Sequence, residues 1–124
     1  MYGCLAVGAG GFAGAVLRYL ISLAPVKETT VFPVKTFIIN IAGCILIGCI
    51  AALVSKNVLL NKELVLFLKT GFCGGFTTFS TFALETSGLI KNGNTGTAFL
   101  YMVLSIVTGI CVIFAAQYFI CEHL

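Results

Sequence analysis

The sequence predicts an all-α membrane protein whose chain crosses the bilayer four times. Of its 124 residues, 60% are apolar and only 9% are charged, and the mean hydropathy is +1.13. Four apolar segments reach or approach the roughly 20 residues that a bilayer core requires, and they span 2–24, 34–54, 64–90 and 97–121. The connections are short, so residues 1–124 form a single four-span unit in a cell membrane. This organisation leaves no room for a soluble domain and makes a nucleic-acid partner unexpected.

The first segment is expected to be a retained span rather than a signal peptide. It has no basic N-terminal region, and it carries Arg18 within the apolar stretch. Its G-x-G-x-x-A pattern lies in a membrane span rather than in a soluble βαβ unit, so a dinucleotide site is excluded. Gly10 and Gly14 instead have the small-residue spacing that allows two membrane helices to approach closely. Arg18 either extends towards the polar interface or lines a basic vestibule that gathers anions.

The third segment contains the least helix-like stretch of the chain, GFCGGFTTFSTF at residues 71–82. Because glycine weakens a helix, the cluster of Gly71, Gly74 and Gly75 predicts a break near the middle of this span. Backbone groups freed there must be buried in protein or bind a ligand. If two inverted copies of the chain met at their breaks, the converging carbonyls could hold a small hard cation such as Na⁺. A kinked helix that binds nothing is the alternative.

Two phenylalanines follow this break, three positions apart and therefore on one helical face. The rings of Phe79 and Phe82 have positive edges, which can contact a dehydrated anion without trapping it as a buried cation would. Packing alone is the usual role of such a pair. Glu85 follows one turn later, where it either tunes an entrance or satisfies nearby donors, and Lys69 is expected to be a flanking residue that extends to the interface.

Hydroxyl groups and one amide complete the polar lining. In the second segment, Asn40 offers two N–H donors. In the fourth segment, hydroxyls recur at helical spacing along one stripe, which comprises Thr97, Tyr101, Ser105 and Thr108. Uncharged donors with rotatable hydrogens suit a small hydrated anion that must be dehydrated and then released.

The basic residues give almost no topological preference. Lys56, Lys62 and Lys69 belong to one side, whereas Lys27, Lys35, Lys91 and Arg18 belong to the other. Three charges against four predict insertion in both orientations under the positive-inside rule. A single, weakly specified orientation is the alternative. Because the chain is too small to enclose a pathway alone, we expect an antiparallel, dual-topology homodimer with a two-fold axis in the membrane plane.

The chain resembles the Fluc (CrcB) fluoride channels in three motifs that occur in the family's order. They are GGFAGAVLRY at 10–19, NIAGCILIG at 40–48 and GFCGGFTTFSTF at 71–82. The resemblance implies a fluoride-selective channel in a prokaryotic plasma or inner membrane, which relieves toxicity by passively exporting F⁻ that enters as HF. It also implies an antiparallel homodimer with two pores.

The same resemblance assigns roles to individual residues. It implies a structural Na⁺ at the dimer interface, held by the backbone carbonyls of Gly74 and Thr77 from both subunits. It implies that Phe79 and Phe82 contact F⁻ through their ring edges and that Asn40 helps to coordinate the ion. A polar track is implied for Ser80, Thr81, Tyr101 and Ser105. Arg18 matches the family's first-helix arginine, and Gly109 with Thr108 stands where the family's track offers a further hydroxyl.

Three other functional classes are weaker interpretations. A small multidrug-resistance-type cation/proton antiporter is also a four-span antiparallel dimer, but its mechanism requires a carboxylate in the first helix, where this chain has none. A structural subunit of a larger complex would use the hydroxyl stripe only for helix contacts. An enzyme is unexpected because no nucleophile and base pair emerges. The six cysteines show no C-x-x-C spacing, so we expect free, buried thiols.

Overall fold

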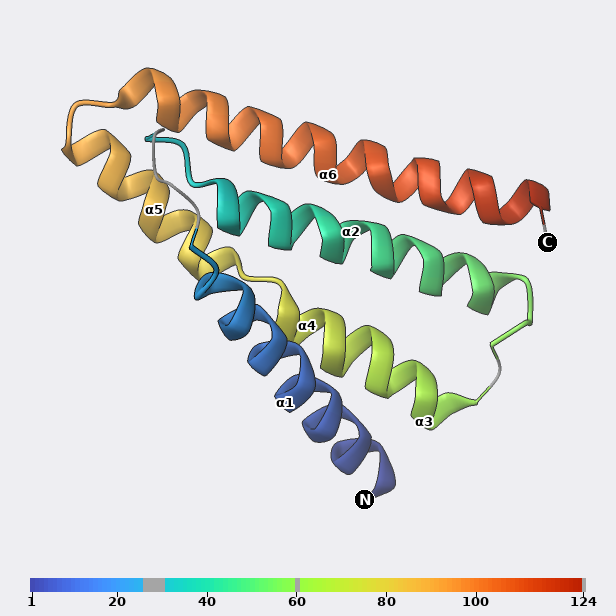
Figure 1. Ribbon diagram of the computed structural model, residues 1–124. Coiled ribbons are helices and arrows are strands. Elements are labelled where there is room, and N and C mark those ends of the chain that lie inside the picture. Colours follow the sequence, from blue (N-terminus) through green and yellow to red (C-terminus); the bar gives the residue numbers. More distant parts are fainter. Residues whose placement is uncertain (26–30, 60, 124) are drawn as a thin grey trace.

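The computed structural model describes residues 1–25, 31–59 and 61–123, and in these ranges the regular structure is helical, as predicted (Figure 1). Three long helices, α1 (Tyr2–Ser22), α2 (Val34–Ser55) and α6 (Thr95–His123), are each long and apolar enough to cross a membrane. The third segment comprises α3 (Lys62–Val65), the π-helix η1 (Leu66–Cys73), α4 (Gly74–Phe76) and α5 (Phe79–Lys91). These short helices follow one another along the chain, so the third segment, α1, α2 and α6 make four helical segments in the described residues.

The segments alternate in direction, which places the helix ends in two groups. The start of α1, the end of α2, the start of α3 and the end of α6 lie towards one end of the molecule, and the opposite termini lie towards the other (Figure 1). This is the division on which the count of basic residues depends. Lys27, one of the counted residues, lies outside the described residues.

The third segment is interrupted at Thr77 and Thr78, as its composition predicts. Both residues have extended backbone, with φ −80° and ψ 158° at Thr77 and φ −148° and ψ 114° at Thr78. The interruption follows the glycine cluster instead of lying within it. The predicted break near the middle of the third segment is confirmed, and the glycines that precede it remain helical, in η1 and α4.

The glycines serve instead to bring the third segment against α1. A Cβ atom on Gly71 would lie 2.6 Å from the carbonyl oxygen of Val7, and one on Gly14 would lie 2.8 Å from the amide nitrogen of Phe76. A Cβ atom on Gly10 or Gly75 would likewise lie too close to backbone atoms of the facing segment. The predicted close approach through Gly10 and Gly14 is confirmed, and its partner is the third segment. Glycine is required on both helices because side chains would separate two backbones that touch.

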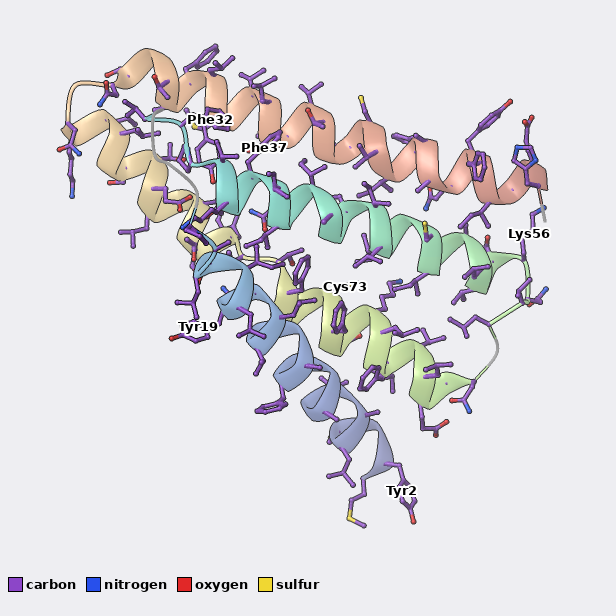
Figure 2. All side chains as sticks on the ribbon, in the orientation of Figure 1. Tyr2, Tyr19, Phe32, Phe37, Lys56 and Cys73 are labelled. Carbon is purple, nitrogen blue, oxygen red and sulfur yellow. The ribbon has the colours of Figure 1, made fainter. Side chains whose placement is uncertain are left out.

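The buried centre lies where α5, α6 and the start of α2 meet. Tyr101 and Ala98 of α6 are fully buried, and Leu89 of α5 packs beside them. Phe32, which precedes α2, and Phe37 of α2 cover this cluster (Figure 2). Many other large apolar side chains are exposed, as expected of helices that face lipid. The six cysteine thiols are free, as predicted, but the prediction that they are buried holds fully only for Cys73, and Cys4, Cys111 and Cys121 are exposed in the single chain.

Candidate functional site

The break in the third segment is held by one side chain from α2. The Asn40 Nδ2 group donates to the carbonyl oxygen of Thr78 at 3.2 Å, and the Thr78 N–H donates to Asn40 Oδ1 at 2.8 Å. Asn40 Oδ1 therefore replaces the backbone acceptor that the Thr78 N–H loses when the helix is interrupted, and Asn40 Nδ2 adds a donor to the Thr78 carbonyl. One of the two amide N–H donors is used in this way, and the second remains available to a ligand.

A second interaction caps the helix that resumes after the break. Thr78 is the N-cap residue of α5, and its Oγ1 accepts a hydrogen bond from the Thr81 N–H at 3.2 Å. The N-terminus of α5 is thus fixed in the interior of the span, beside Phe79. A helix N-terminus carries partial positive charge and unpaired N–H groups, so this position favours an anion without placing a full charge there.

These two interactions release the carbonyl groups of Gly74 and Thr77. In an uninterrupted helix the Gly74 carbonyl would accept from the Thr78 N–H, and the Thr77 carbonyl would accept from the Thr81 N–H. Both donors are engaged elsewhere, by Asn40 Oδ1 and by Thr78 Oγ1. Gly74 is also exposed on the chain surface. Freed carbonyls at a broken membrane helix are suitable ligands for Na⁺, so the residues present fit the expected cation.

A cavity of about 410 Å³ lies on one side of the break, and we call it the Asn40 cavity. It is bounded by residues from α2, the third segment and α6. Its lining comprises Asn40, Gly43, Cys44, Ile47, Lys69, Cys73, Gly74, Thr77, Thr78, Phe79, Phe82, Ser105 and Ile106. The cavity therefore brings together the amide, both phenylalanines, one hydroxyl of the fourth segment and both predicted cation ligands.

A second cavity, of about 440 Å³, lies near the C-terminal end of α1, and we call it the Arg18 cavity. Its lining comprises Ala15, Arg18, Tyr19, Ser22, Lys35, Thr36, Ile39, Thr78, Thr81 and Glu85. The Lys35 ammonium also donates to the carbonyl oxygen of Ser22 at 3.0 Å, near the end of α1. Arg18 thus lines a basic recess, which agrees with the vestibule hypothesis. Thr78 lines both cavities, so the break separates them.

The two phenylalanines form a pair, as their spacing predicts. Their ring centroids are 5.9 Å apart and the ring planes are inclined by 42°. Phe82 continues the contact inwards to Tyr101, with centroids 4.9 Å apart. Phe79, however, is 79% exposed in the single chain. The exposed ring of Phe79 is therefore available for contact with a molecule outside the chain.

Glu85 is held inside the protein by two hydroxyl groups. Thr36 Oγ1 donates to Glu85 Oε1 at 2.7 Å, and the Tyr101 hydroxyl donates to Glu85 Oε2 at 2.8 Å. Of the two roles open to Glu85, satisfying nearby donors is the one that these contacts show. The acid also links α2, α5 and α6 at the edge of the Arg18 cavity.

The hydroxyl groups do not all lie along one cavity. Ser105 lines the Asn40 cavity, and its Oγ is buried without a hydrogen-bond partner. Thr81 lines the Arg18 cavity and accepts a hydrogen bond from Thr78 Oγ1 at 3.0 Å. Ser80 lies 3.4 Å from the same Thr78 oxygen. Tyr101, Ser80 and Thr108 are outside the lining of both cavities.

Sequence reasoning missed four residues of this region. Thr36 and Lys35 precede Asn40 in α2, and nothing in their spacing indicated a contact with Glu85 or with the end of α1. The sequence indicated Thr78 only as one hydroxyl of a cluster, whereas in the structure Thr78 lines both cavities and is hydrogen-bonded to Asn40. Lys69 was expected at a flank but lines the Asn40 cavity.

Comparison with known proteins places this geometry in context. The family model for "CrcB-like protein, Camphor Resistance (CrcB)" matches residues 5–117. A fluoride-specific ion channel FluC of Prosthecochloris aestuarii is 52% identical over 105 residues, covering 85% of this chain and 82% of that protein. The protein of that name from Chlorobaculum tepidum is 49% identical over 115 residues, covering 93% and 91%. That of Phocaeicola vulgatus is 45% identical over 111 residues, covering 89% and 91%.

Proposed function

Because the chain belongs to the CrcB family, we propose that it is a fluoride-selective channel that passively exports F⁻ and so relieves fluoride toxicity. It is a multi-pass bacterial membrane protein, and its family consists of channels, not enzymes. Relatives that align over most of the chain are named fluoride-specific ion channels. The observation that carries the proposal is the interrupted third span, where Asn40 fixes Thr78 beside the two phenylalanines.

The lining of the Asn40 cavity supports anion passage without strong binding. The second N–H of Asn40, the partnerless hydroxyl of Ser105 and the ring edges of Phe79 and Phe82 supply positive ends of dipoles. Each can replace part of the hydration shell of a small anion, whereas a full positive charge in contact with the ion would hold it too tightly for rapid release. Thr81 and Thr78 supply further hydroxyls towards the Arg18 cavity.

A homodimer of antiparallel copies completes the proposal. The exposed ring of Phe79 and the exposed Gly74 lie on a surface that a second copy would cover, and the near balance of basic residues favours insertion both ways. The carbonyls of Gly74 and Thr77, freed from their helical donors, would hold Na⁺ where the two copies meet. When bound, that ion would supply a fixed positive charge between the two copies.

The alternative of a small multidrug-resistance-type antiporter is not favoured. Its mechanism needs a proton-exchanging carboxylate on the first helix, and α1 contains no acidic residue. Glu85 is on α5, where Thr36 and Tyr101 both donate to it. The relatives are also named as channels.

The proposal is tested by measuring the selectivity for F⁻ over Cl⁻. Purified protein in liposomes loaded with KF or KCl, with valinomycin to carry the compensating K⁺, should release F⁻ and retain Cl⁻. The larger chloride ion cannot be contacted by the same donors in a narrow passage. Equal efflux of the two anions, or no efflux of F⁻ from liposomes that contain dimeric protein, would refute it.

A further inference from the structure

Lys69 occupies an unexpected place for a basic residue of a membrane span. It lies in η1, about two turns beyond Lys62 at the start of the segment. A flanking lysine would reach back to the interface, but Lys69 lines the Asn40 cavity with Asn40, Gly74 and Ser105. Lys69 is exposed in the single chain.

The charge of Lys69 is not balanced within this cavity. Among the residues that line the cavity, it is the one with a charged side chain. Moving an ammonium group into hydrocarbon costs about 2.5–3.5 kcal/mol at the centre of a span even on the lower scales. That position is stable if the cavity holds water, and a hydrated cavity with one fixed positive charge has a positive potential throughout.

The two cavities have similar charge and meet at Thr78. The Arg18 cavity contains Arg18 and Lys35 against Glu85, an excess of one positive charge, and the Asn40 cavity contains Lys69 alone. The uncharged groups of the break lie between them. An anion that moves from one cavity to the other would therefore have an attracting charge at each end of its route.

We propose that Lys69 is an anion-attracting residue of the conduction pathway, which raises the local concentration of F⁻ at the Asn40 cavity as Arg18 and Lys35 do at the other. The proposal rests on fluoride conduction, because it assigns a residue to that pathway. Lys69 acts through its charge and at a distance. Its contribution must then depend on the sign of the side chain and on the ionic strength.

A charge series in proteoliposomes tests the proposal. Fluoride efflux is measured with an electrode for the wild type, Lys69→Arg, Lys69→Met and Lys69→Glu at equal protein density. Ionic strength is set with potassium gluconate at about 10 mM and about 1 M, where the Debye lengths are about 30 Å and 3 Å. Lys62→Met is the matched control, because it removes one charge from the same segment outside both cavities. Size-exclusion chromatography verifies that each variant is dimeric.

At low ionic strength, Lys69→Met should reduce efflux about two- to four-fold, as expected for one unit charge roughly 10 Å from the ion in a partly hydrated site. Lys69→Glu should reduce it further, and Lys69→Arg and Lys62→Met should match the wild type. The differences should nearly vanish at high ionic strength. An equal loss at both ionic strengths, or a loss in Lys69→Arg as large as in Lys69→Met, would show a packing role and overturn the proposal. Wild-type efflux in Lys69→Glu at low salt would also overturn it, whereas an inactive wild type would refute fluoride conduction itself.

Discussion

Replacing Asn40 with alanine should destabilise the protein because the side chain has two backbone partners that nothing else replaces. The substitution removes the hydrogen bond to the Thr78 carbonyl at 3.2 Å and the one from the Thr78 N–H at 2.8 Å. Thr78 is buried, with 9% of its surface exposed, so water cannot easily take over both contacts. Leaving a buried donor or acceptor unsatisfied costs about 1–3 kcal/mol. The two contacts together predict a loss of about 2–5 kcal/mol in the free energy of unfolding.

The assay is equilibrium unfolding in mixed micelles with increasing sodium dodecyl sulfate, followed by circular dichroism of the helices. All variants are compared at one protein concentration, because the apparent stability of the proposed dimer would depend on it. Asn92→Ala is the control, since Asn92 is an exposed residue at the end of α5. It should change the free energy of unfolding by less than about 0.5 kcal/mol. An Asn40→Ala protein as stable as Asn92→Ala would refute the role assigned to Asn40.

Two further predictions concern helix packing and the cation. Gly14→Ala should destabilise the protein by about 1–3 kcal/mol, because its new Cβ would lie 2.8 Å from the Phe76 nitrogen. Gly8→Ala on the same helix is the control, because a Cβ atom there would meet open space. Equal unfolding midpoints for the two variants would contradict this packing. Exhaustive replacement of Na⁺ by N-methyl-D-glucamine should abolish fluoride efflux, and returning Na⁺ should restore it. Undiminished efflux after that exchange would refute the proposed role of Na⁺.

The sequence was sufficient to predict the class of fold and the interruption of the third segment, where the candidate site lies. Hydropathy alone identifies the four segments, because a bilayer core demands about 20 apolar residues in a row. The spacing of Gly10 and Gly14 correctly predicts close packing of the first helix. The spacing of Phe79 and Phe82 correctly predicts that their rings lie together. These are local patterns, which a single helix is enough to reveal.

The cause of the break could not be predicted, because it depends on a contact between distant segments. Glycine content indicated Gly74 and Gly75, but those residues stay helical, since α1 packs against this part of the chain. The helix is interrupted where Asn40, 38 positions earlier, offers Thr78 replacement hydrogen bonds. The link from Thr36 to Glu85, across 49 positions, was hidden for the same reason. The roles of Gly74 and Thr77 as Na⁺ ligands remain predictions.

The most direct test of the account is fluoride efflux from liposomes that contain Phe82→Ile protein, beside wild type and Leu84→Ile at equal density. Leu84 is an exposed residue of the same helix that lines neither cavity, so its substitution should leave the rate unchanged. If F⁻ passes beside the ring edges at the break, efflux through Phe82→Ile should fall to the rate of protein-free liposomes, while its circular dichroism and its size-exclusion elution volume match those of the wild type. Efflux at the wild-type rate in Phe82→Ile would contradict the account.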